Sequence, residues 1–349
     1  MYESFFGLTG KPFQLNPDPS FFFGSRGHKR AFAYLEYGLY QNEGFIVITG
    51  EIGAGKTTIV RSLLEQLDSS KVVAAQLVST QLQADDMLRA VGTAFGLPVR
   101  SVDKAVLLAS LEAFLCQLTV DKKRALLIVD EAQNLAPGAV EELRMLSNFQ
   151  LGDQALLQSF LVGQPELRAM MQGPQMQQLR QRVIASYHLG PLDKSETQAY
   201  IEHRLKHVDW KGDPRFDPAC FDLIHALTGG IPRRINTLCN RLLLATFLAE
   251  RHVVEADDVQ TIAREIGEEM GSDGPLAQVT VIGGGNDPSG EGLHLARIDS
   301  AVWHRHFNQI EERIDRLERT VGGAVDLLHH LLHPDKASTN KPATPPRKR

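Results

Sequence analysis

The sequence predicts an α/β domain built on a parallel sheet, then an all-helical domain, and then a C-terminal coiled coil. Three observations lead to this fold class. Apolar runs alternate with helical patterns up to residue 190, helical patterns alone fill 191–268, and apolar residues recur at spacings of four and three beyond 293. A chain of 349 residues is long enough for two domains and an appendage.

The first domain is predicted over residues 1–190. A Phe/Pro-rich arm leads into a helical pattern with Ala31, Leu35 and Leu39 on one face. Uninterrupted apolar runs then indicate parallel strands covered on both faces, and helical patterns separate them, as in a three-layer sandwich. These runs are FIVIT (45–49), VVAAQLV (72–78), ALLIVD (125–130) and SFLVGQ (159–164).

The second domain, residues 191–268, shows helix starts and stops without strand patterns. In LDKSETQAYIEHRL, Ser195 with Gln198 three residues later predicts a capped helix start. FDLIHALTGG ends in a glycine stop, and Pro232 stands near the start of the following helix. VEADDVQTIAREI is a further helix. We expect a small helical lid domain here.

Three segments are predicted after the lid domain. Residues 269–292 are rich in Gly and polar residues and indicate a flexible linker. The heptad-like spacing over 293–333 favours a short coiled coil, and a single amphipathic helix folding back on the body is the alternative. Residues 334–349 are expected to form a disordered basic tail.

Composition limits the function classes. Hydrophobic residues make up 43% and charged residues 23%, and the net charge of −5 argues against a surface built as a whole to attract nucleic acid or anionic lipid. The isolated cysteines Cys116, Cys220 and Cys239 are expected to be buried thiols in a reducing compartment. No signal peptide or transmembrane run is recognised. We therefore expect a cytoplasmic protein, with peripheral attachment at the inner membrane left open.

The segment GEIGAGKTT follows the first apolar run and has the Walker A spacing of glycines, lysine and threonine. Gly53 and Gly55 would let backbone N–H groups approach phosphates, at the start of a helix whose dipole favours an anion. Lys56 would reach the β- and γ-phosphates, and Thr57 would offer its hydroxyl to Mg²⁺. The predicted nucleotide-binding residues of this loop are Gly50, Glu51, Ile52, Gly53, Ala54, Gly55, Lys56, Thr57 and Thr58.

A second motif, ALLIVDEAQ, ends the third apolar run with two carboxylates. Asp130 is predicted to lie beside the glycine loop and to hold Mg²⁺ together with Thr57. Glu131 follows the metal ligand and could polarise an attacking water. The two motifs together indicate hydrolysis of a nucleoside triphosphate rather than binding alone.

Further polar residues follow in an order that fits such an enzyme. Gln164 ends the fourth run and could sense the γ-phosphate or orient water, or it could cap the next turn. Arg180 or Arg182 could act as an arginine finger on a neighbouring subunit, and surface arginines are the alternative. Arg233, at the first turn of a lid helix, could reach back to the γ-phosphate.

The order of Walker A, DEAQ, GQPEL, LRQRV and GGIPRRIN resembles AAA+ ATPases of the ExeA/GspA type, within the broader Orc/Cdc6-like group. The similarity is closer still to the ATPase of exosortase (PEP-CTERM) and exopolysaccharide loci, and it covers roughly residues 1–268. The resemblance implies a P-loop NTPase fold, ATP with Mg²⁺, Glu131 as catalytic base, Gln164 as sensor 1 and Arg233 as sensor 2. It also implies that residues 23–30 lie near the adenine.

The resemblance further implies a homo-oligomeric ATPase that drives conformational change in a bacterial secretion, exopolysaccharide or protein-sorting system. ExeA-type relatives carry a transmembrane segment and a periplasmic part that are not recognised here, so we expect a membrane-associated protein partner. An ATP-dependent DNA-binding switch of the Orc/Cdc6 or transposition type is the alternative, but no helix-turn-helix pattern is recognised after the lid. A non-enzymatic regulator is a third possibility, against which Glu131 argues.

Overall fold

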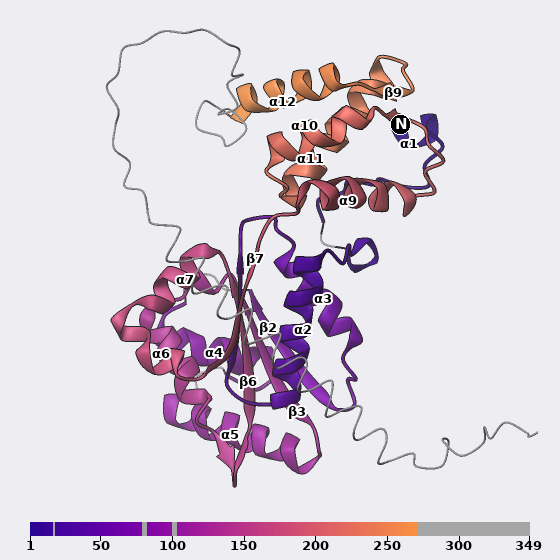
Figure 1. Cartoon of the computed structure of the whole chain (residues 1–349). Helices are drawn as coiled ribbons and strands as arrows, with labels where there is room; N and C mark the ends of the chain where they lie inside the picture. The colour runs from indigo at the N-terminus through magenta and orange to yellow at the C-terminus, as the bar shows by residue number, and fades with distance from the viewer. Residues whose placement is uncertain (17, 79–81, 100–102, 271–349) are drawn as a thin grey trace, which may run out of the picture. The chain divides into compact units, whose positions relative to one another are not determined.

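The computed structural model describes residues 1–16, 18–78, 82–99 and 103–270 (Figure 1). The chain divides into two units, Met1–Val281 and Ile282–Arg349, and the described residues all belong to the first. The predicted coiled coil, the basic tail and the linker beyond residue 270 lie outside the described residues. No helix among the described residues combines the length and the apolar character needed to cross a membrane.

A five-stranded parallel sheet forms the centre of the first part of the chain, with strand order β2-β3-β6-β1-β7. Each of the apolar runs identified in the sequence is confirmed as a strand of this sheet. The edge strand β7 was not predicted. The strands are β1 (Phe45–Gly50), β2 (Val72–Val78), β3 (Arg124–Asp130), β6 (Leu157–Gly163) and β7 (Val183–Leu189).

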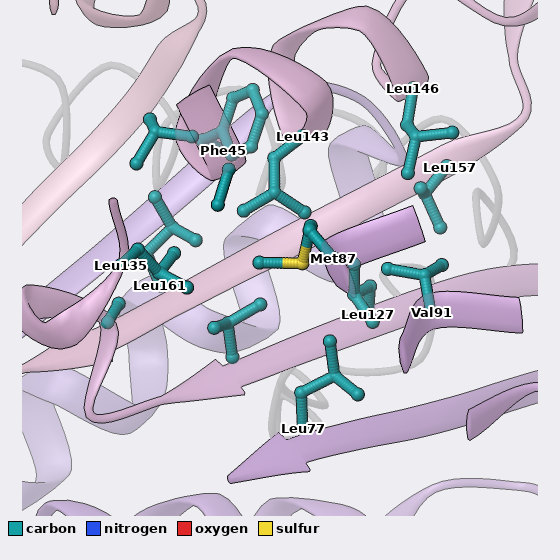
Figure 2. Close-up of a cluster of buried hydrophobic side chains, with 14 of the residues drawn as sticks. Phe45, Leu77, Met87, Val91, Leu127, Leu135, Leu143, Leu146, Leu157 and Leu161 are labelled. Atoms are coloured by element: carbon teal, nitrogen blue, oxygen red, sulfur yellow. The ribbon is translucent and has the colours of Figure 1, made fainter. Parts of the chain in front are cut away.

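Alternate residues of β1 enter two different hydrophobic clusters, which makes the sheet the middle of three layers. Phe45 and Val47 pack with residues of α4, α5, α6 and α7, whereas Ile46 and Ile48 pack with residues of α2 and α3. Figure 1 shows α2 and α3 on one side of the sheet and α4, α5 and α6 on the other, and Figure 2 shows the side chains of the first cluster. The bounds are α2 (Arg26–Gln41), α3 (Lys56–Gln66), α4 (Ala84–Ala94), α5 (Lys104–Val120), α6 (Pro137–Leu146) and α7 (Pro165–Gln172).

Short elements complete this part of the chain. They are η2 (Ala132–Asn134), the hairpin strands β4 (Gln150–Leu151) and β5 (Gln154–Ala155), η3 (Pro174–Met176) and α8 (Gln177–Arg180). The turn η2 follows β3 directly, so the sequence DEAQ runs from the end of a buried strand into a single helical turn. This places its polar side chains at the carboxyl edge of the sheet.

The helices predicted after residue 190 are present: α9 (Lys194–Lys206), α10 (Pro218–Thr228), α11 (Pro232–Leu248) and α12 (Ala256–Met270). The short strands β8 (Arg215–Phe216) and β9 (Val253–Val254) pair beside them. As predicted, α10 stops at a glycine, Gly229 (φ 62°), and Pro232 is the first residue of α11.

The predicted cap of α9 was wrong by two residues. The capping box consists of Asp193, whose carboxylate accepts the backbone N–H of Glu196 at 2.8 Å, and of the Glu196 side chain, which accepts the Asp193 N–H. The Ser195 hydroxyl also donates to Asp193, at 2.7 Å. Because Asp193 lies two residues before Ser195 and its carboxylate accepts the backbone N–H of the third helical residue, the helix begins before Ser195.

The N-terminal arm packs with the helices that follow residue 190. It contains α1 (Tyr2–Phe5) and η1 (Pro19–Phe21). Phe6, Leu8 and Phe13 are buried in one cluster with apolar side chains of α9 to α12. The buried guanidinium of Arg204 in α9 donates to the carbonyl oxygen of Pro12 at 2.5 Å, which satisfies a charged group in that core. Residues distant in sequence thus share one core.

Candidate nucleotide site

The glycine loop lies between β1, which ends at Gly50, and α3, which begins at Lys56. Gly53 and Gly55 have φ of +82° and +102°, a region that side-chain-bearing residues rarely adopt. A Cβ on Gly53 would lie 2.3 Å from Cβ of Arg233, and one on Gly55 would lie 2.6 Å from Nε2 of His28. Both glycines are therefore required by conformation and by space.

Lys56 is 6% exposed, and its ammonium group donates to the carbonyl oxygens of Gly50 at 2.7 Å and Glu51 at 3.0 Å. Burial lowers the pKa of Lys56, and the charges of Glu131 and Asp130 oppose that change. The cation is thus held at the loop by backbone acceptors and by two carboxylates. An anionic phosphate bound at the loop would be stabilised by a charge-assisted hydrogen bond from this ammonium group.

Thr57 and Asp130 come from different elements and meet at the loop. The Thr57 hydroxyl donates to Oδ2 of Asp130 at 3.1 Å. Burial raises the pKa of Asp130, while the backbone N–H of Glu131 and the Thr57 hydroxyl oppose this. A hydroxyl and a carboxylate are the hard oxygen donors that suit Mg²⁺, whose remaining positions are usually filled by water and phosphate. The donor set fits the predicted metal.

No cluster of three or more His, Cys, Asp or Glu side chains able to hold a metal occurs in the described part of the chain. A Mg²⁺ ion bound by Thr57 and Asp130 would need phosphate and water oxygens to complete its shell, which is the usual arrangement at nucleotide sites. The predicted roles of both residues in metal binding stay predictions.

Glu131 lies at the centre of a hydrogen-bonded group. Its Oε2 accepts the side-chain amides of Gln133 at 2.6 Å and Gln164 at 2.9 Å, and Oε1 of Gln133 accepts the backbone N–H of Gln164 at 2.9 Å. Partial burial alone would raise the pKa of Glu131, but these two amides and the charge of Lys56 lower it overall. An ionised carboxylate is therefore favoured, as a general base requires.

Sequence reasoning selected Glu131 and Gln164 for this group and missed Gln133. The signal was present in the motif DEAQ, since a polar side chain two residues past Glu131 can fold back in a tight turn. The φ of +52° at Glu131 produces that turn and could not be read from the sequence.

A cavity of about 210 Å³ opens beside the glycine loop. Of the predicted loop residues, Ile52, Gly53, Gly55, Lys56, Thr57 and Thr58 line it. Gly50, Glu51 and Ala54 are not among the lining residues: the carbonyl oxygens of the first two accept from Lys56, and Ala54 is buried. Glu131, Arg233 and residues of the arm, α2, α9 and α11 complete the lining: Gln14, Leu15, Asn16, Asp18, Phe21, Phe22, Phe23, His28, Tyr200, Arg204, Pro232 and Asn236.

Two further expectations concern this cavity. Arg233 is brought to it, because the backbone N–H of Arg233 donates to the Gly53 carbonyl at 3.2 Å at the start of α11. Phe23 and His28, from the segment expected near the adenine, also line it. The assignment of these residues to particular parts of a nucleotide remains a prediction.

The two candidate finger arginines are not at the cavity. Arg180, exposed in α8, donates to the carbonyl oxygens of Met171 and Gly173 at 2.5 and 2.8 Å. Arg182 donates to the Ser147 carbonyl oxygen and hydroxyl at 3.0 and 2.9 Å. A finger acts on the nucleotide of another copy, so the role of either arginine stays a prediction.

The parallel sheet, the loop between β1 and α3, and the Thr57–Asp130 pair define an α/β P-loop fold of the AAA type, followed by helices. Residues 39–171 match the family model described as AAA domain. Among solved structures, the ORC2 protein of Aeropyrum pernix has a TM-score of 0.56 at 20% identity, covering 73% of this chain and 71% of that one. Cdc6p from Pyrobaculum aerophilum gives 0.55 at 16%, covering 73% and 70%. Identities this low show likeness of fold alone.

The chain is related in sequence to general secretion pathway protein A of Aeromonas hydrophila, with 40% identity over 268 residues. This match covers 76% of the present chain and 48% of the relative, so it spans about half of the relative's length. The expected AAA+ fold and the resemblance to the GspA type are confirmed at this level. An AAA domain implies ATP binding and hydrolysis. The finer resemblance to exosortase-locus ATPases stays a prediction.

Proposed function

We propose that this protein is a Mg²⁺-dependent ATPase that drives conformational change in a secretion or polymer-assembly system of the bacterial envelope. One observation carries the proposal: a single cavity is bordered by Lys56, Thr57 and Glu131, which follow strands of the sheet, and by Arg233 from α11. The proposed cation, metal ligand and base of the sheet part thus meet an arginine from the helices that follow it. That combination suits hydrolysis coupled to movement.

Each of these residues has a separate task in the proposed reaction. Lys56 neutralises charge on the phosphates, and Glu131, kept ionised by its amide donors, accepts a proton from the attacking water. Gln164 donates to Glu131 and holds it at the strand end. Mg²⁺ at Thr57 and Asp130 would draw charge from the phosphate oxygens.

Arg233 is the proposed link between hydrolysis and movement. It begins α11, and its backbone bonds the glycine loop at Gly53. A charged guanidinium at the cavity would be attracted by a γ-phosphate and released when that phosphate leaves. Movement of α11 would follow the state of the nucleotide, because the helix and the arm share one core.

The relationship to general secretion pathway protein A supports a partner in an envelope system. We propose a cytoplasmic homo-oligomer, in peripheral contact with the inner membrane through a membrane-associated protein, with Arg180 or Arg182 completing the site of a neighbouring copy. Because the motifs also resemble those of ATPases from exopolysaccharide and exosortase loci, the proposed partner system includes exopolysaccharide and protein-sorting systems.

The test is ATP turnover by the Lys56→Ala variant, measured as phosphate release. We expect turnover to fall to background, since the buried cation is lost. Lys71→Ala is the matched control, because Lys71 is exposed and pairs with Asp68 at the surface. Turnover by Lys56→Ala equal to that of the control would refute the site. For the partner, co-purification with an ATP-locked Glu131→Gln variant should enrich an envelope-associated protein that Lys56→Ala does not.

A further inference from the structure

Gln133 makes contacts with both groups that the proposed hydrolysis needs at the strand ends. Its amide nitrogen donates to Oε2 of Glu131 at 2.6 Å, and its amide oxygen accepts the backbone N–H of Gln164 at 2.9 Å. Glu131 follows β3 and Gln164 follows β6, which are neighbours in the sheet. One side chain therefore ties the ends of two strands together.

The place that Gln133 occupies is formed by two local features. Glu131 has φ +52° and ψ +39°, and the chain then turns through η2, which returns the Gln133 side chain toward β3. Gly163, the last residue of β6, makes room for it, since a Cβ there would lie 2.7 Å from Oε1 of Gln133. The left-handed conformation of Glu131 after β3 and the absence of a side chain at Gly163 in β6 therefore both allow the contacts of Gln133.

The contact limits how Glu131 can orient. A carboxylate with a single donor can rotate about that bond, whereas two donors on Oε2 fix both its plane and its direction. Lys56 is the cation that faces Glu131, and Asp130 is the adjoining carboxylate. With Oε2 held by the amides of Gln133 and Gln164, the other oxygen is directed to accept a proton from water.

We propose that Gln133 is a positioning residue for ATP hydrolysis, which aligns Glu131 and couples it to the Gln164 end of β6. This inference rests on the proposed ATPase function. Gln133 does not line the cavity, so it acts through Glu131 and Gln164 rather than on the nucleotide. Its loss should reduce kcat and leave nucleotide binding nearly unchanged.

The test compares the wild-type chain with Gln133→Met, which keeps the length of the side chain and removes its hydrogen bonds. We expect kcat to fall about tenfold, the effect of losing one bond to a charged group, with KM changed by less than about twofold. Asn134→Ala, an exposed change in the same turn, should leave both unchanged.

Each outcome separates this inference from the proposed function. A wild-type chain that hydrolyses ATP, with an identical kcat in Gln133→Met, overturns the role of Gln133 and leaves the ATPase standing. A rise in KM with kcat unchanged also overturns it, since the loss would then lie in binding. A wild-type chain without turnover overturns the proposed function and this inference with it. Gln133→Glu, which places a like charge beside Glu131, should lower kcat at least as far and serves if the methionine variant does not fold.

Discussion

The backbone N–H of Arg233 donates to the carbonyl oxygen of Gly53, and the Arg233 side chain covers the same glycine. The first turn of α11 thereby meets the phosphate loop at a point where no Cβ can be accommodated. Changes at this contact should affect nucleotide binding and the position of α11 together.

Gly53→Ala tests this contact. The added methyl would stand 2.3 Å from Cβ of Arg233, and the φ of +82° is itself unfavourable for alanine by about 1–2 kcal/mol. We expect ATP affinity to fall at least tenfold, measured by calorimetry. Gly152→Ala is the control, because Gly152 has φ +63° but open space around its Cα. Equal ATP affinities for the two variants would show that the loop tolerates the methyl.

Thr57→Val should raise the Mg²⁺ concentration that ATP turnover requires. The valine keeps the shape of threonine and removes the hydroxyl that donates to Asp130 at 3.1 Å. We expect the Mg²⁺ concentration for half-maximal turnover to rise by roughly tenfold, about 1.4 kcal/mol. Thr119→Val is the control, since its hydroxyl donates to a backbone carbonyl within α5. An unchanged Mg²⁺ requirement in Thr57→Val would remove Thr57 from the metal site.

Phe13→Ala should destabilise the nucleotide-free protein. Phe13 is 1% exposed and packs in the cluster formed by the arm and α9 to α12. Removing a buried phenyl ring lowers the free energy of unfolding by about 3–5 kcal/mol. Leu15→Ala, two residues on and 56% exposed, should change it by less than about 0.5 kcal/mol. Denaturant unfolding measures both, and similar losses would mean that the arm contributes little to the core.

His28 should make stability fall as the solution becomes acidic. Burial lowers the pKa of His28, although a backbone hydrogen bond with Ala54 and the charge of Glu196 oppose this. The unfolded chain takes up a proton below about pH 6.5 and the folded chain resists it, so stability is lost from that pH downward. His28→Gln, which is not protonated in this range, should lose less free energy of unfolding between about pH 8 and pH 6 than the wild type. Parallel losses in the two proteins would exclude His28 as a source of the effect.

Four strands of the central sheet were predictable because each is an apolar run, including the edge strand β2, VVAAQLV. The other edge strand, β7, VIASYHL, has Ser186, Tyr187 and His188 where such a run would continue, and most of its side chains are partly or fully exposed. Apolar runs are required where a strand is covered on both faces, so the sequence of an exposed edge strand can lack one. The early start of α9 was missed because Ser195 with Gln198 has the spacing of a capping box, whereas the residue that accepts the N–H three positions on is Asp193, from Glu196.

The loop and strand-end residues of the site could be found because their spacing and order are local in sequence. The contacts of Gln133 with Glu131 and Gln164 could not, since they depend on a left-handed residue and on the register of β3 against β6. The packing of Phe13 against α9 to α12 could not be predicted either, because no sequence pattern near Phe13 identifies a partner almost two hundred residues away.

The shared core of the arm and the last helices has a consequence for biosynthesis. Ribosomes deliver the arm first, whereas α12 emerges only after the whole sheet domain. The apolar side chains of Tyr2, Phe6 and Phe13 therefore stay exposed to solvent while more than half of the polypeptide is made, because the helices that bury them come later. Nascent chains of this protein should engage chaperones at their amino end until translation passes residue 270.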